Sequence, residues 1–342
     1  MERVDFFVIF ELLGFFAFIV ILGREIFQRN RLKVFEIISC AVFGMILEIG
    51  NTFLAHTYSY GPDFSIKILN IPLVIGLYWS TVVYSVMLLS DQYNIPWKLK
   101  PFMDALTAVI IDLTLDVVAI RLGFWKWALP ETQEWFGIPY ANLVGWILIV
   151  FVFSFIIRFI RTLNPKRIMT DALMLLAPIF SYLGLLIGLG IFSFFTVFPY
   201  QINNWTNRLD FNYKPDLAII NNPQVQFWSQ IVFVVIMVEL VNVVIWSVVK
   251  YKKKFTGHFD LLSFFFLSFS HMFSIVALLV SGIYKELPFF VFFGILMFVA
   301  YLLLHFLPFL LRPANVYVFR KIEKVIEKDE RKIEKIIDKS FR

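Results

Sequence analysis

Three aspartates, Asp104, Asp112 and Asp116, lie in one otherwise apolar stretch of the chain, residues 101–121. An ionised carboxylate near the centre of a bilayer costs at least a few kcal/mol, so these side chains are expected to face protein. On an α-helix, residues four apart project about 40° from each other, and residues eight apart about 80°. All three can therefore face one interior groove, which is our candidate site. Asp104 follows Pro101, so a helix N-terminal acid stabilised by the helix dipole explains that residue equally well.

Other polar and aromatic residues lie in the neighbouring segments. Glu48 is near the end of one apolar stretch, and Asn142 is near the start of another. The aromatic residues nearby are Tyr58, Tyr60, Trp79, Trp125, Trp127, Trp135 and Trp146. A neutral carboxylic acid in apolar surroundings can donate a proton, and aromatic faces stabilise a nearby cation. These groups together suit protonation of an electron-rich alkene and stabilisation of the carbocation that forms.

A purely structural explanation of the same residues is also open. The Trp side chains can form an ordinary aromatic belt at the membrane interface, and the acids can pair with Arg121 or Lys126. For each Trp taken alone, the belt is the simpler explanation. For the acids we favour a functional role.

Several kinds of site are excluded or disfavoured by the motifs that the chain lacks. It has no Walker loop, no GxGxxG after a strand and no HExxH; its four histidines are far apart, and it has one cysteine. A metal or disulfide framework is therefore not expected. The Asp112-x-x-x-Asp116 pair is similar to the magnesium-binding acids of membrane prenyltransferases, but the second acidic motif of those enzymes is missing.

The composition is that of an integral membrane protein. Of 342 residues, 60% are hydrophobic and 19% aromatic, whereas soluble domains are about 45–50% apolar. The mean hydropathy is +0.78. The net charge of +6 does not indicate nucleic-acid binding, because Lys and Arg are concentrated in short loops and in the tail. We expect a polytopic, all-α protein in contact with membrane lipid.

Nine apolar stretches are long enough to cross a bilayer: residues 5–23, 34–55, 66–89, 101–121, 140–162, 171–199, 225–249, 260–284 and 287–311. Lys and Arg are concentrated in the loops after the first, third, fifth and seventh stretches. The positive-inside rule then predicts a multi-pass protein of the cell membrane with its N-terminus outside and its C-terminus in the cytoplasm. The N-terminus has no small-residue cleavage site, so the first stretch is expected to be a span and not a removed signal peptide.

The chain divides into a transmembrane helical domain, residues 1–311, and a charged tail, residues 312–342. An apolar stripe in the tail predicts an amphipathic helix that lies on the inner membrane surface or pairs with a partner helix. A solvated helix is an equally open explanation. The polar loop 200–223 is expected to cap the candidate site.

Two groups of motifs follow one another in a characteristic order. The first group is Glu48-Ile-Gly-Asn51, Tyr58-Ser-Tyr60, Pro72-Leu73 and Trp79. The second group is Asp112-Leu-Thr-Leu-Asp116, Gly123-Phe-Trp125-Lys-Trp127 and Phe136-Gly137-Ile-Pro139-Tyr-Ala-Asn142-Leu-Val-Gly145-Trp146. Over residues 44–160 this pattern resembles the carotenoid biosynthesis family that includes the bacterioruberin-pathway carotenoid 1,2-hydratases. The chain differs from the family in having Val117-Val118 after the second aspartate, where a proline is usual, and in the linker 130–135.

The resemblance implies a membrane hydro-lyase that adds water to the terminal double bond of an acyclic, lycopene-like carotenoid. Asp116 or Asp112 would be the general acid, Glu48 its partner or the base that activates water, and Asn142 the residue that holds the water. The substrate-binding residues would be Tyr58, Tyr60, Trp79, Trp125, Trp127 and Trp146. No cofactor is expected, because hydration transfers no electrons.

Two further hypotheses stay open at this stage. One is a non-catalytic lipid or polyene binder, or a transporter, in which the acids form structural ion pairs. The other is a different cation-forming isoprenoid enzyme, a cyclase or an isomerase, acting on the same end group or on another polyisoprenoid. All the enzymatic hypotheses begin with protonation and differ in how the cation is quenched.

Overall fold

The computed structural model describes residues 5–128, 134–163, 167–204, 222–252 and 259–311. The predicted tail helix and most of the predicted capping loop, residues 205–221, lie outside these ranges.

Helices form almost the whole of the described chain, as the sequence predicts. Within the described ranges there are nine long helices, α1 (Phe6–Phe27), α2 (Arg31–Ile49), α3 (Leu73–Asp91), α4 (Lys100–Leu122), α5 (Tyr140–Leu163), α6 (Arg167–Asn204), α8 (Pro223–Tyr251), α9 (Leu261–Val280) and α10 (Pro288–Leu310). Each corresponds to one of the nine predicted stretches. Seven of the nine are long and apolar enough to cross a membrane. The remaining two, α2 and α4, carry more charged residues than a typical span.

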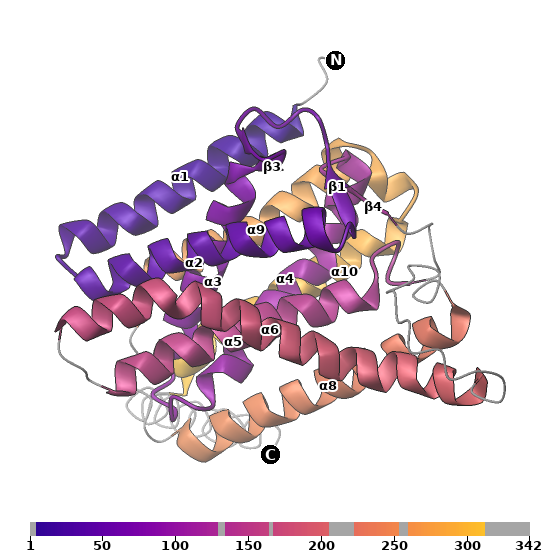
Figure 1. Ribbon diagram of the computed structural model, residues 1–342. Coiled ribbons are helices and arrows are strands. Elements are labelled where there is room, and N and C mark those ends of the chain that lie inside the picture. The colour runs from indigo at the N-terminus through magenta and orange to yellow at the C-terminus, as the bar shows by residue number, and fades with distance from the viewer. Residues whose placement is uncertain (1–4, 129–133, 164–166, 205–221, 253–258, 312–342) are drawn as a thin grey trace, which may run out of the picture.

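The charged helix α4 is the centre of the bundle. It packs against α3, α5, α8, α9 and α10, and every residue from Met103 to Ala119 is buried (Figure 1). The neighbouring helices therefore shield the three aspartates from lipid, as their cost in a bilayer requires. Pro101 lies in the first turn of α4, and Gly123, with a φ of +82°, ends the helix. A left-handed residue at this position favours glycine, and it turns the chain into the strand that follows.

Two small sheets were not predicted. β1 (Tyr58–Tyr60) pairs antiparallel with β4 (Trp125–Trp127), and β2 (Lys67–Ile68) pairs with β3 (Ile71–Pro72). The second pair explains why α3 begins at Leu73, later than the predicted residue 66. Strands are recognised in a sequence by alternating apolar and polar residues over at least four positions. Strands of two or three residues are too short to show this alternation, so the sequence predicts only helices here.

The β1–β4 pair lies at one end of the bundle, which we call the strand end (Figure 1). It joins the loop after α2 to the loop after α4. A single π-helical turn, η1 (Gly50–Leu54), extends α2 towards this pair. The strand end therefore holds two loops in a fixed position over the ends of α2, α3, α4 and α5.

Candidate functional site

A cavity beneath the β1–β4 pair contains most of the predicted site. Its empty volume, which includes space open to the outside, is about 550 Å³. Nine of the ten predicted site residues line it: Glu48, Tyr58, Tyr60, Trp79, Asp116, Trp125, Trp127, Asn142 and Trp146. The tenth, Asp112, does not line the cavity but contacts Asn142. Trp135 lies elsewhere, with its Nε1 donating to the Leu113 carbonyl.

The two short strands place four aromatic side chains over this cavity. In the antiparallel register, Tyr58 is opposite Trp127 and Tyr60 is opposite Trp125. Because side chains alternate along a strand, these four share one face, and Ser59 and Lys126 occupy the other. The alternations Tyr-Ser-Tyr and Trp-Lys-Trp thus form a roof that is aromatic on the inside and polar on the outside.

Glu48 is the buried acceptor for three of the predicted site residues. Its Oε2 accepts hydrogen bonds from the Tyr58 hydroxyl and from the Tyr60 hydroxyl, the latter at 2.6 Å, and its Oε1 accepts from Trp79 Nε1 at 2.9 Å. Burial, and then the nearby Glu48 carboxylate, raise the pKa of both tyrosine hydroxyls well above the usual value. Both hydroxyls therefore stay protonated and remain donors to Glu48.

Asn51 is a site residue that the sequence-based assignment missed. It lines the cavity from η1, and its Nδ2 donates to the Tyr58 hydroxyl at 3.3 Å. The signal was present in the sequence, because Asn51 follows Glu48 by three residues in an apolar helix and so lies on the same face.

The two aspartates of α4 form a second acidic group, joined by Asn142. Asn142 Nδ2 donates to Asp116 Oδ2 at 2.5 Å and to Asp112 Oδ2 at 3.4 Å. Asp112 is 0% exposed and Asp116 is 2% exposed. The two carboxyl groups therefore share one donor. Two neighbouring carboxyl groups buried away from water are costly as two negative charges, so one of them is expected to keep its proton.

Neither aspartate has a cationic partner among the described residues. Arg121, the partner considered from the sequence, instead pairs with Glu286 at 3.0 Å and donates to two backbone carbonyls. Lys126 is also not in any ion pair of the described residues. The structural explanation by ion pairing with Arg121 or Lys126 is therefore wrong for Asp112 and Asp116. An acidic pair that shares a proton and lies against an aromatic cavity can act as a proton donor.

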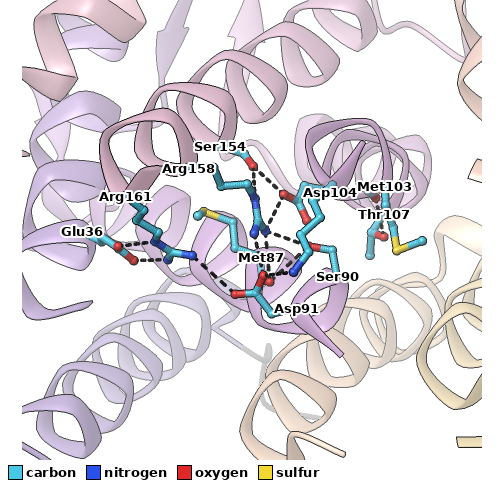
Figure 2. A network of polar contacts seen from close by, with 11 residues as sticks. Glu36, Met87, Ser90, Asp91, Met103, Asp104, Thr107, Ser154, Arg158 and Arg161 are labelled. Carbon is cyan, nitrogen blue, oxygen red and sulfur yellow. Dashed lines mark hydrogen bonds and ion pairs between the residues drawn. The ribbon is translucent and has the colours of Figure 1, made fainter. Parts of the chain in front are cut away.

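Asp104 does not share this site, contrary to the expectation of one groove. It lies eight residues before Asp112, about 12 Å along the helix axis. A similar direction on the helical wheel therefore does not bring the two side chains together. Its Oδ2 accepts from Ser154 at 2.5 Å and pairs with Arg158 Nη2 at 3.1 Å (Figure 2). It also lies beyond the first turn of α4, so the helix-dipole explanation does not hold either. Asp104 is part of a buried ion-pair network at the opposite end of the bundle.

This network joins four helices. Arg158 of α5 also pairs with Asp91 of α3 at 2.5 Å, and Arg161 of α5 pairs with Glu36 of α2 at 2.5 Å (Figure 2). Through Asp104 it includes α4. Arg158 is only 3% exposed, so its charge depends on these partners for compensation.

Replacing Arg158 by Leu is expected to lower the free energy of unfolding by about 3–5 kcal/mol, the cost of leaving a buried ion without its partner. Arg31→Leu is the matched control, because Arg31 pairs with Asp171 but is largely exposed, and exposed pairs contribute only about 0–1 kcal/mol. Thermal unfolding of the purified protein in detergent would compare them. Equal transition temperatures for the two variants would contradict a stabilising role of the network.

Comparison with known proteins places the site in a family context. The sequence model for carotenoid biosynthesis proteins matches residues 6–203, which include α1 to α6 and all ten predicted site residues. The match is wider than the range 44–160 that the motifs indicate. A curated relative, bisanhydrobacterioruberin hydratase of Haloarcula japonica, is 26% identical over 169 residues, 45% of this chain and 56% of that protein. The chain thus matches only about half of its relative's length. No solved structure matches it significantly.

Proposed function

This chain belongs to the carotenoid biosynthesis protein family, and we propose that it is a membrane-embedded hydratase of an acyclic, lycopene-like carotenoid. The observation that carries the proposal is the pairing of two different acidic groups at one aromatic cavity. One is the pair Asp112 and Asp116, which share Asn142 as a donor, and the other is Glu48, which accepts three hydrogen bonds. The distant relative named as a hydratase supports the same reaction.

In the proposed reaction Asp116 is the general acid. It lines the cavity, whereas Asp112 does not, so Asp116 delivers the proton and Asp112 shares it. The proton adds to the less substituted carbon of the terminal double bond, and the other carbon becomes a tertiary cation. Trp79 and Trp146, whose ring centroids are 4.2 Å apart, lie at the cavity with the roof aromatics and stabilise this cation through their faces.

Glu48 is proposed to activate the water that captures the cation. A carboxylate offers about four acceptor sites, and Glu48 uses three of them on Tyr58, Tyr60 and Trp79. The fourth can accept from a water molecule, whose oxygen bonds to the cationic carbon as its proton passes to Glu48. Return of that proton to Asp116 completes the cycle. The net change is one alkene and one water to one tertiary alcohol, with no electron transfer and no cofactor.

Asn142 receives a different role from the one that the sequence suggests. Its amide nitrogen donates to both aspartates, so we assign it to holding the acidic pair in position and not to holding the water. From the charge pattern of the loops, we propose that the protein lies in the cell membrane with the strand end outside.

The direct test is to produce the protein in a host that makes lycopene and to analyse the extracted pigments by mass spectrometry. We expect a product heavier by one water for each modified end. A product of unchanged mass but altered retention would replace hydration by cyclisation or isomerisation. Unaltered pigment, both from lycopene and from a longer acyclic carotenoid, would contradict an enzymatic role and favour a binder or transporter.

A further inference from the structure

A second, narrow cavity lies beside the aromatic one in the membrane-spanning part of the bundle. Its empty volume, which includes space open to the outside, is about 370 Å³, and two residues, Phe10 and Tyr78, line both cavities. It lies between α1, α3 and α9 and extends along α1 as far as Ala17. From Phe10 to Ala17 a helix advances about 10 Å. The second cavity therefore leads away from the strand end, along the helices.

The lining of this second cavity is hydrocarbon in character. Most of it comes from Phe, Leu, Ala and Gly side chains. The hydroxyls of Thr81 and Ser270 donate to carbonyls of their own helices, Leu77 at 3.0 Å and Phe266 at 3.1 Å. These hydroxyls are therefore already hydrogen-bonded, and the two side chains contribute mainly carbon atoms to the cavity wall. Among the described residues that line this cavity there is no carboxylate, lysine, arginine or histidine, and Tyr78 is the one with an ionisable side chain.

The wall formed by α1 is the one nearest to lipid. α1 packs closely on α3 and touches α9 at few points. Its opposite face is exposed, with Leu12, Phe16 and Ile19 more than half accessible. Gly14 keeps α1 close to α3, since a Cβ there would lie 2.4 Å from Val74 Cγ2. The seam between α1 and α9 is thus the part of the wall with the fewest contacts between helices.

We propose that this second cavity binds the polyene chain of the substrate while its end group lies in the aromatic cavity, and that the chain enters from lipid through the seam between α1 and α9. The inference rests on the proposed function. A long, rigid hydrocarbon whose end reaches Asp116 must leave the aromatic cavity by an apolar path. The side chains of Phe10 and Tyr78 separate the two neighbouring spaces, so the chain would pass between them.

Filling the second cavity should discriminate against long substrates. Ala17→Phe, in a residue only 7% exposed, places a ring in the path, and Ser270→Leu does so from the opposite wall. Leu12→Phe on the lipid-facing side of α1 is the control. The two substrates compared are a full-length acyclic carotenoid and a short acyclic monoterpene with the same end group. For Ala17→Phe we expect the ratio of their kcat/KM values, long to short, to fall at least roughly tenfold. The added ring occupies the space of the long chain, and overpacking such a space is unfavourable. The control should keep the wild-type ratio.

Binding is measured alongside turnover, as quenching of tryptophan fluorescence by the polyene in detergent micelles. Weaker polyene binding by Ala17→Phe and Ser270→Leu, but not by Leu12→Phe, supports the assignment of the second cavity. This holds even if the wild-type protein makes no hydrated product, and in that case only the proposed reaction fails. Hydration by the wild-type protein with an unchanged substrate ratio and unchanged binding in both folded cavity variants would overturn the assignment and leave the reaction standing. Thermal unfolding shows which variants are folded.

Discussion

Replacing Asp116 by Asn is expected to lower turnover by roughly 10²–10⁴-fold, the usual contribution of a general acid, while the protein remains folded. The asparagine side chain has nearly the same shape, and its carbonyl can still accept the hydrogen bond from Asn142. It cannot supply a proton to an alkene. The loss should therefore appear in kcat, with little change in the amount of protein in the membrane. Product is measured by mass spectrometry and normalised to folded protein.

Asp104→Asn is the matched control for this prediction. It makes the same substitution in the same helix, and Asp104 is equally buried, but it lies in the Arg158 network and not at the cavity. We expect it to reduce thermal stability and to retain turnover per folded molecule. Asp112→Asn should give an intermediate loss, because it removes the group that shares the proton. Full turnover of folded Asp116→Asn protein would remove Asp116 from the mechanism.

Replacing Glu48 by Gln is expected to reduce turnover by roughly 10²-fold or more, in the range found when one preorganised electrostatic group is removed from a site. The amide is a weaker acceptor, and its NH₂ group would face donors that now point at a carboxylate. It can neither stabilise the cation by charge nor accept a proton from water. The free energy of unfolding should also fall by about 1–3 kcal/mol, because buried donors lose their acceptor.

Tyr60→Phe separates these effects. It removes one of the three donors to Glu48 but leaves the carboxylate and the aromatic ring in place. We expect a much smaller loss of turnover than in Glu48→Gln, and both variants are assayed on the same substrate. If Tyr60→Phe were as inactive as Glu48→Gln, the network and not the charge of Glu48 would be the essential feature. Wild-type turnover by folded Glu48→Gln protein would contradict its role as the base.

The helical part of the fold could be predicted because each span contains its own signal. An apolar stretch of sufficient length is a local property, and all nine predicted stretches correspond to helices. The acids in α4 indicate a helix surrounded by protein, and α4 is the central helix. The two observations agree because a charged side chain is costly in lipid, so a helix with several acids is expected to be surrounded by protein.

The roof of the cavity could not be predicted in the same way. The β1–β4 pairing joins residues far apart in the sequence, and three-residue strands have no local preference strong enough to reveal it. The aromatic residues were found from their types alone, and their common position became apparent only from the register. The separation of Asp104 from the other acids has a similar cause, because a helical wheel gives the direction of a side chain and not its depth in the membrane.

Asp104 and Asp116 belong to one unbroken helix, and this links the two ends of the bundle. The buried ion pair of Asp104 with Arg158 and its hydrogen bond from Ser154 hold α4 at a fixed rotation and height. Asp116 lies about 18 Å further along the same helix. Adding one residue between them would turn Asp116 by about 100°, away from the cavity, without altering any residue of the site. The ion-pair network at the opposite end of the bundle therefore fixes the direction in which Asp116, the proposed proton donor, points.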